Sequence, residues 1–495
     1  MTSQQQPRTY GGWRRGRGIG LFGLGTTTAT FLVLGVFIAL LVTAAISPGA
    51  LIWLAPPAVA GCGIGLVRRD GTPAAQIGVQ RARWWWAVRR GYTRYRCEAL
   101  VASAGTVQLP GVLAGLELLS AEDGYGTRYG LVRDRHTGYL TATLRVVPAS
   151  TWLADRDDAD GWIAGWGSWL AALGYVSMVR WVSVTVDTAP DPGASLADSV
   201  SAGIDPDAPQ AARDIMSALA ATAPATAADV DTRVSVTFDP AASPAKPGTV
   251  ADAVAEVGRA LHGLQSQLGS CGVAVTGRCR AVDIAGVVRA AYDPALRGEI
   301  RRVVAGASAD DPRLSWSNAG PGGADELWDR YRHESGVSVS WAWREAPRQN
   351  VHADVLARLT APGPWPKRVT LQYRPLPASA ATRVLESEVR AAEFRQEYAR
   401  RTHRDATARD AFDHARARQA AMEEAQGAGV TLISLYVTVT APSGDMLPHA
   451  IAAIEAAAES SKVQLQRFYG SQAAAFTVGL PCGISLHDLS RRSLR

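Results

Sequence analysis

The 495-residue chain contains five cysteines in no CxxC arrangement, which excludes a disulfide framework and a cysteine-ligated zinc site. Its formal net charge of +6 is uneven: residues 1–100 carry twelve arginines against Asp70 and Glu98, a net of +10, whereas the remaining residues carry −4. The basic part is suited to anionic lipid headgroups, and the acidic remainder argues against a body that binds nucleic acid.

The first predicted element is a transmembrane hairpin. No Asp, Glu, Lys, Arg or His occurs from residue 18 to residue 67, and the apolar blocks 27–46 and 51–67 are separated only by Ser-Pro-Gly-Ala. About 20 apolar residues cross the hydrocarbon core as a helix, and about 17 is the lower limit. We therefore expect residues 27–67 to cross the membrane twice and residues 1–26 to form a basic N-terminal segment.

Flanking arginines predict the orientation of this hairpin. Four arginines precede it, and Arg68 and Arg69 follow it. Because positive residues beside membrane spans stay cytoplasmic, the pattern predicts a two-pass protein of the cytoplasmic membrane with its N-terminus and its C-terminal body in the cytoplasm. A cleaved secretory signal peptide is the alternative for the first block, since small residues near Ala44 offer a cleavage site. In the second block, Gly61 and Gly65 have the GxxxG spacing that permits close helix packing, within the hairpin or against another subunit.

A basic and aromatic juxtamembrane segment, residues 68–96, comes next. Seven of its residues are candidates for contact with the membrane interface: Arg81, Arg83, Trp84, Trp85, Trp86, Arg89 and Arg90. Tryptophan favours the headgroup region, and arginine can extend to lipid phosphates. Two alternatives remain open, namely a helix or strand whose tryptophans pack on a domain, and a segment that stacks single-stranded nucleic acid.

Residues 97–300 are expected to form a first α+β module in the cytoplasm. Alternating apolar residues predict strands at 129–134, 138–147, 177–186, 234–238 and 273–278. Helical spacing predicts helices at 160–173, 208–221 and 250–268. This order is typical of an α+β fold in which the helices cover one face of a sheet. His136 is expected to lie on the surface in the turn before the second strand.

A second α+β module is expected at residues 310–490. Strands are predicted at 337–344, 368–374, 430–440 and 463–469, and the segment 378–426, which lacks Pro and Gly, is predicted to be a helical insertion. This insertion is either a solvated surface or a docking arm for a partner. His136, about 200 residues earlier, precedes a predicted strand, and His333 does the same. His333 is therefore also expected in a surface turn. Two diverged copies of one module explain this recurrence, and chance similarity of two hairpins is the alternative.

No motif for catalysis occurs in the sequence. None of the three lysines, Lys246, Lys367 and Lys462, follows a glycine-rich turn as a P-loop lysine does, and the GxGxxG pattern at 18–23 follows no strand. HExxH and GxSxG are absent. The carboxylates of 155–160 are expected to cap the following helix. The sequence therefore predicts no catalytic residue, no cofactor and no metal site, and a protein that is not an enzyme.

Several stretches resemble known secretion proteins. The basic N-terminus, the hairpin and the basic-aromatic segment resemble the small PrgI-type membrane subunit of type IV secretion systems. Residues 129–145 and 169–192 resemble membrane proteins of actinobacterial conjugative elements. Residues 469–483 are similar to the end of the non-catalytic N-terminal region of type IV secretion ATPases, which precedes their motor domain. The layout also resembles the E component of actinobacterial type VII (ESX) secretion cores.

These resemblances imply a structural subunit of a secretion or conjugation complex. The implied partners are other membrane subunits of that complex and a separate membrane-associated ATPase, in a hetero-oligomer without a small-molecule substrate. A membrane-anchored enzyme whose site forms only in three dimensions is the alternative function. A subunit that handles nucleic acid is a further alternative, against which the acidic body argues.

Overall fold

The computed structural model describes residues 68–69, 72–97, 109–124, 126–149, 154–190, 207–222, 228–308, 311–345, 351–401 and 429–492, together with 200, 203–205, 419 and 422. The predicted hairpin 27–67, with Gly61 and Gly65, and the N-terminal segment 1–26 lie outside these residues. Within the described ranges, no helix has both the length and the apolar composition that crossing a bilayer requires.

The chain divides into two compact units. The first contains Met1–Arg14, Arg94–Pro377 and Gly429–Arg495, and the second contains Arg15–Thr93 and Ala378–Ala428. Both predicted modules, apart from the insertion 378–426, therefore belong to the first unit.

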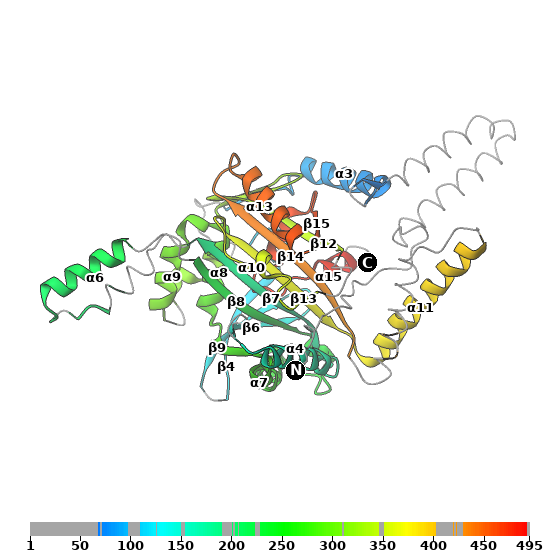
Figure 1. Cartoon of the computed structure of the whole chain (residues 1–495), viewed down its shortest axis with the longest axis horizontal. Helices are drawn as coiled ribbons and strands as arrows, with labels where there is room; N and C mark the ends of the chain where they lie inside the picture. Colours follow the sequence, from blue (N-terminus) through cyan, green and yellow to red (C-terminus); the bar gives the residue numbers. More distant parts are fainter. Residues whose placement is uncertain are drawn as a thin grey trace, which may run out of the picture. The chain divides into compact units, whose positions relative to one another are not determined.

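A large antiparallel sheet of thirteen strands forms the first unit (Figure 1), and with its helices it confirms the predicted α+β class. The strand order is β3-β10-β11-β12-β14-β13-β7-β8-β6-β5-β4, and β15 and β9 pair with β12 and β6. The strands are β3 (Arg94–Arg96), β4 (Leu116–Glu122), β5 (Arg128–Asp134), β6 (Leu140–Pro148), β7 (Val179–Pro190), β8 (Ala228–Phe238), β9 (Val273–Arg278), β10 (Gly323–Glu326), β11 (Tyr331–His333), β12 (Gly336–Glu345), β13 (Lys367–Pro375), β14 (Thr431–Ala441) and β15 (Gln464–Arg467).

Helices connect most of these strands. The α-helices of the first unit are α4 (Arg156–Leu173), α6 (Gln210–Thr222), α7 (Val250–Gln267), α8 (Ala281–Tyr292), α9 (Arg297–Gly306), α10 (Ala357–Thr360), α13 (Leu447–Ser460), α14 (Gln472–Thr477) and α15 (Leu486–Arg492). Short 3-10 turns lie at η2 (Gly111–Leu113), η3 (Pro240–Ala242), η4 (Leu268–Cys271), η5 (Pro294–Leu296), η6 (Pro312–Leu314) and η7 (Trp316–Asn318). The predicted helices at 160–173, 208–221 and 250–268 are confirmed as α4, α6 and α7.

Strands β7 and β13 join the two halves of the sheet. They pair from Val182 opposite Tyr373 to Thr188 opposite Lys367. The order of strands outward from this junction is the same in both halves: β8, β6 and β5 on one side correspond to β14, β12 and β11 on the other, with β9 and β15 added to β6 and β12. At the middle of the junction, the hydroxyls of Thr185 and Thr370 are 3.0 Å apart.

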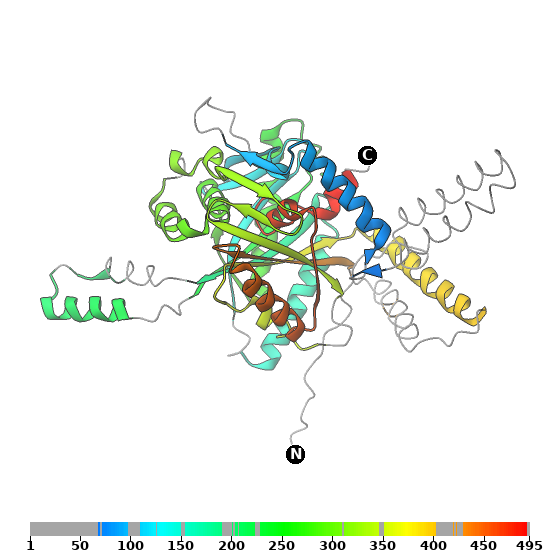
Figure 2. The ribbon, with the colours of Figure 1, turned by 90° about the horizontal axis from the view of Figure 1, so that it is seen from above.

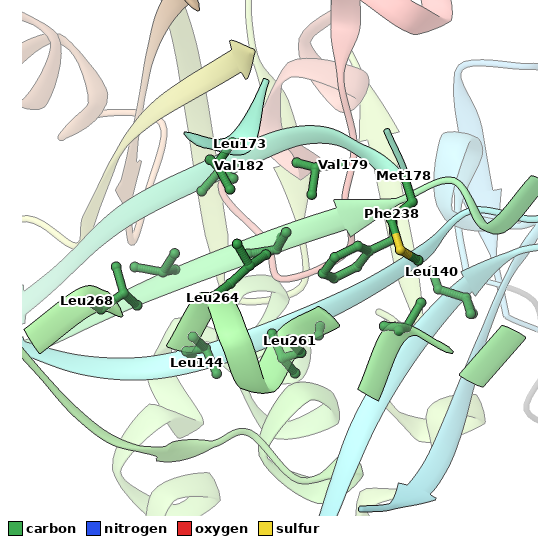
Figure 3. Packing of buried hydrophobic residues seen from close by; sticks show 14 of the residues in the cluster. Leu140, Leu144, Leu173, Met178, Val179, Val182, Phe238, Leu261, Leu264 and Leu268 are labelled. Carbon is green, nitrogen blue, oxygen red and sulfur yellow. The ribbon is translucent and has the colours of Figure 1, made fainter. Parts of the chain in front are cut away.

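Apolar side chains fill one face of this sheet. In the first half, residues of β6 and β8 pack with Trp169 and Leu173 of α4 and with Leu261 and Leu264 of α7. Figure 3 shows the leucines of β6 and of α7 with Phe238 in this cluster. In the second half, Val437 and its neighbours on β12 and β14 pack with α13. Alternation along the strands, with a period of two, explains why these apolar side chains share a face.

The opposite face is also covered, so the expectation that helices cover only one face is wrong. Gly130 of β5 lies against Ala281 and Ile284 of α8, and Phe476 of α14 packs with Tyr436 of β14. The strands carry Ser and Thr on this face, and these hydroxyls hydrogen-bond to one another across neighbouring strands. Because the hydroxyls satisfy each other, this polar face can be buried at little cost.

In the part of the second unit that the structure describes, a short strand pair and a helix follow one another, and a longer helix lies later in the chain. β1 (Arg68–Arg69) pairs with β2 (Thr72–Pro73), and α3 (Ala74–Arg89) follows at once. α11 (Ala378–Arg401) confirms the first part of the predicted helical insertion, and the remainder of 378–426 lies outside the described residues except at 419 and 422, which are helical. Figure 2 shows α3 in blue and α11 in yellow.

Candidate functional site: an exposed basic and aromatic helix

The candidate interface residues lie on helix α3 and on the turn that ends it. Six of the seven are exposed and Trp84 is partly buried. The helix ends where Gly91 adopts a φ of 74°. There the Tyr92 N–H donates to Ala87 O at 3.0 Å and the Gly91 N–H donates to Val88 O at 3.1 Å. This bond pair is the glycine-dependent Schellman ending of a helix, and it fixes the position of Arg90 and Tyr92.

Arginine and tryptophan side chains stack in pairs along α3. The guanidinium of Arg89 lies 4.0 Å from the ring centre of Trp85, one helical turn earlier, and that of Arg90 lies 4.9 Å from Trp86. Tyr92 meets Trp86 edge to face at 6.0 Å. Spacing by four residues places these side chains on the same side of the helix. The cation–π contacts hold each guanidinium beside an aromatic ring while its N–H groups stay available to an anion.

Exposure of the two stacked tryptophans distinguishes α3 from a core helix. Trp85 is 54% exposed and Trp86 is 52% exposed, whereas Trp169 of α4 is 3% exposed. Large aromatic side chains that remain exposed together usually mark a binding surface. With Arg81 and Arg83 on the same helix, the surface offers aromatic rings and positive charge together. Such a surface suits the headgroup region of an anionic membrane, where rings and guanidinium groups both find partners.

We expect the exchange of α3 backbone amides to depend on lipid charge. In nanodiscs of the full-length protein, hydrogen–deuterium exchange in α3 should be at least about tenfold slower with phosphatidylglycerol than with phosphatidylcholine, because each arginine near an anionic surface contributes about 1 kcal/mol. Replacing Arg81, Arg83, Arg89 and Arg90 with glutamine should remove the difference. The control Arg390→Gln, on exposed α11, should leave it unchanged. Equal exchange in both lipids would contradict the assignment.

His136 and His333 differ, although both were expected in surface turns. His136 is exposed, as predicted, but His333 is fully buried, so the prediction for it is wrong. The Nδ1 of His333 lies 2.6 Å from Tyr292 O, and its Nε2 lies 2.8 Å from the hydroxyl of Ser338. His333 is the last residue of β11, and α8 places Tyr292 against it, which local sequence does not reveal. Burial lowers the pKa of His333 to about 4, so the ring is neutral near pH 7.

This buried histidine predicts a loss of stability in mild acid. Its pKa is below the unfolded value of about 6.5, so the unfolded state binds the proton more strongly. The free energy of unfolding should therefore fall as the pH decreases from about 6.5 to about 4, by about 3 kcal/mol in total. Urea unfolding at several pH values measures this. His333→Gln should remove the loss of stability between pH 6.5 and pH 4, whereas the exposed control His136→Gln should show the same loss as the native protein. If His136→Gln removed the loss and His333→Gln did not, the buried ring of His333 would not be its source.

A buried ion network lies on the polar side of the β7–β13 junction. Asp187 accepts from Arg233 at 3.0 Å and from Arg297 at 2.9 Å, and Arg297 also donates to Asp229 at 2.9 Å. Burial alone would raise the pKa of Asp187, but the guanidinium groups of Arg297 and Arg233 outweigh it and hold the pKa well below the usual range. The partners are 46 and 110 residues apart, so no local pattern could have predicted the network. It fixes the structure rather than offering a reactive group.

Two other predictions concern carboxylates and metal sites. Asp155 occupies the residue before α4 but makes no side-chain cap hydrogen bond, while Asp157 and Asp158 lie in the first turn, where the helix dipole favours them. In the ranges that the structure describes, no three or more His, Cys, Asp or Glu side chains form a group that could hold a metal ion.

No known protein-family model matches this chain, and no curated protein is detectably similar to it.

Proposed function

We propose that this chain is a non-catalytic structural subunit of a membrane-embedded secretion or conjugation complex, of the type IV-like or type VII kind. In this proposal, residues 27–67 anchor the chain in the cytoplasmic membrane and the described sheet lies on the cytoplasmic side, beside a separate ATPase. The observation that carries the proposal is the exposed arginine–tryptophan surface of α3, a helix that only six residues separate from the end of the apolar run. A segment in that position reaches the inner leaflet as it leaves the second span.

The proposal also includes the origin of the sheet from two related α+β modules. Equivalent strands carry equivalent buried hydroxyl pairs. In the first half, Thr141 pairs with Thr237 and Thr143 with Ser235, each at 2.9 Å. The corresponding second-half pairs, each at 2.8 Å, are Ser338–Thr440 and Ser340–Thr438. Matching pairs on both β6–β8 and β12–β14 support a duplication over the alternative of chance similarity between two hairpins.

A scaffold role suits the way this sheet is built and where it ends. β7 and β13 join both halves, and the buried Asp187 network stiffens the junction, so the sheet can hold partner subunits at fixed separations. β4 is the last strand of the sheet in the described chain, and its outward edge pairs with no other described strand. Such edges accept an added strand from a partner. Isolation of the complex from the native host, with identification of copurifying subunits, tests this role.

A further inference from the structure

The end of the sheet formed by β3, β10 and β11 carries exposed arginines on one of its faces. Arg94 of β3 and Arg332 of β11 both lie opposite Asp325 of β10 in the pairing register. Residues directly opposite on neighbouring strands share a face, so these three positions form a row about 10 Å long across the sheet. Arg96 lies two residues after Arg94 and therefore shares this face. All three arginines are exposed.

The alternate residues of the same strands hold this end of the sheet on the core. Tyr95, Ala324 and Tyr331 pack in the apolar cluster that includes residues of α8 and α14. Burial therefore alternates along β3 and β11, with the arginines at the exposed positions. The position of the arginines on the outer face is thus a consequence of the packing on the inner face.

Positive charge exceeds negative charge on this outer face. The Nη2 of Arg96 donates to both carboxylate oxygens of Asp325, each at 2.9 Å. Arg94 and Arg332 form no side-chain ion pair with any residue that the structure describes. Together the three arginines and the single carboxylate have a net charge of +2, and two of the guanidinium groups are available to an anion.

Other carboxylates at this end of the sheet do not offset that charge, because arginines outside the row already pair with them. Asp329, in the turn between β10 and β11, lies 3.3 Å from the Nη2 of Arg467. Glu334, which follows β11, lies 2.9 Å from the Nη2 of Arg289.

Two stacked aromatic rings lie at the turn 327–330, which joins β10 to β11. The ring of Trp328 stacks on that of Tyr469, with centres 5.8 Å apart and planes inclined at 28°. The Gly470 N–H donates to Trp328 O at 2.7 Å, which fixes this contact. Trp328 is partly exposed and Tyr469 is 40% exposed. Because β3 is antiparallel to β10, this turn is at the end of β3 where the chain arrives from α3.

The chain itself limits how far this surface can be from α3. Arg94 follows Arg89, the last residue of α3, by five residues. Five extended residues span at most about 18 Å. If α3 lies on an anionic leaflet, β3 is therefore within reach of the same leaflet. Guanidinium groups beside aromatic rings suit the headgroup region here for the reason that they do on α3.

We propose that this end of the sheet is a second contact with the anionic leaflet. Arg94 and Arg332 bind lipid phosphates, and Trp328 and Tyr469 lie among the headgroups. This inference rests on the membrane position proposed above, and it goes further because it gives the first unit a membrane contact of its own. Such a contact determines which end of the sheet faces the membrane.

Hydrogen–deuterium exchange of the full-length protein in nanodiscs tests the inference at the turn 327–330. Its backbone amides should exchange at least about fivefold more slowly with phosphatidylglycerol than with phosphatidylcholine, because one arginine near an anionic surface strengthens attachment by about that factor. The amides of α3 are followed in the same samples. Protection of α3 without protection of the turn would overturn this inference and leave the proposed function intact, whereas protection of neither would count against both.

Substitutions of exposed arginines separate the charge effect from simple tethering. The double variant Arg94→Gln with Arg332→Gln should lose the lipid dependence at the turn and keep that of α3. The control Arg128→Gln removes one exposed charge from β5, in the other half of the sheet, and should leave both unchanged. A lipid dependence at the turn that persists in the double variant would overturn the inference.

A soluble polyanion is the other source of phosphate groups, and the same assay distinguishes it. Inorganic polyphosphate, added to phosphatidylcholine nanodiscs at the phosphate concentration of the phosphatidylglycerol sample, should leave exchange at the turn unchanged. Protection equal to that given by phosphatidylglycerol would assign the surface to a soluble polyanion and overturn the membrane contact.

Fluorine NMR with 5-fluorotryptophan gives a second readout at Trp328, whose resonance Trp328→Phe identifies. A lipid that carries a gadolinium chelate on its headgroup should broaden this resonance more in phosphatidylglycerol nanodiscs than in phosphatidylcholine nanodiscs. Equal broadening in the two lipids would contradict the contact.

Discussion

Replacing Asp187 with asparagine is expected to lower the free energy of unfolding by about 3–5 kcal/mol, the usual cost of removing one partner from a buried ion pair. Asp187 is 4% exposed, and Arg233, one of its two partners, is 2% exposed. Without the carboxylate, the buried guanidinium of Arg233 and the partly buried one of Arg297 keep only Asp231 and Asp229 as partners. They then lie beside the buried cation of Arg368 with one negative charge fewer. Urea unfolding of the full-length protein in mild detergent, followed by circular dichroism, measures the change.

The pH dependence of the native protein provides a second measure of the same network. The pKa of Asp187 is lower in the folded state than in the unfolded state, so its contribution is complete above pH 4 and decreases as the pH falls further. Glu386→Gln is the control, because its ion pair with Arg390 on α11 is exposed and contributes about 0.5 kcal/mol at most. A loss for Asp187→Asn no larger than for this control would show that the network does not stabilise the junction.

Gly483→Ala is expected to lower the free energy of unfolding by about 3 kcal/mol. Its φ of 66° is costly for any residue with a Cβ, by about 1 kcal/mol or more. The added methyl group would also overlap the hydroxyl of Thr141, so β6 or the C-terminal segment must shift. The same urea titration measures the effect.

Gly138→Ala is the matched control for this substitution. Gly138 has a similar φ of 74°, but a Cβ there meets no atom within 4 Å. It should therefore cost only the backbone strain, about 1 kcal/mol. The difference between the two variants isolates the packing of the C-terminal segment on the polar face of the sheet. If both variants lower the free energy of unfolding by the same amount, Gly483 does not pack closely against Thr141 as described here.

Local patterns predicted most of the individual strands and helices. The strand Val273–Arg278 has the predicted bounds, and β12, β13 and β14 each differ from the prediction by one residue at either end. These segments alternate apolar and polar side chains, and an alternating pattern depends only on near neighbours. Helix α4 begins four residues before the predicted start, because the aspartates at 157 and 158 form its first turn.

Long-range pairing could not be predicted in the same way. The sequence does not show that β7 and β13 would pair, because any two edge strands offer the same backbone groups. The Ser and Thr residues opposite the apolar face are buried, and their hydrogen-bond partners lie more than 90 positions away in the chain. His333 is likewise buried by a residue far away in the sequence, since its partner Tyr292 lies 41 positions earlier.

Composition alone identified the candidate interface, since three adjacent tryptophans among arginines are conspicuous in any sequence. The stacking of Arg89 on Trp85 follows from helical spacing by four residues, once α3 is known to be a helix.

Purification of the tagged full-length protein from its native host, in mild detergent after crosslinking and with mass spectrometry of the captured proteins, tests the scaffold role most directly. A matched sample carrying Ser120→Pro, which alters the outward edge of β4, shows whether that edge holds a partner. The account predicts recovery of a membrane-associated ATPase together with other membrane subunits, and the family of that ATPase identifies the type of machinery. Recovery of this chain alone after crosslinking would contradict it.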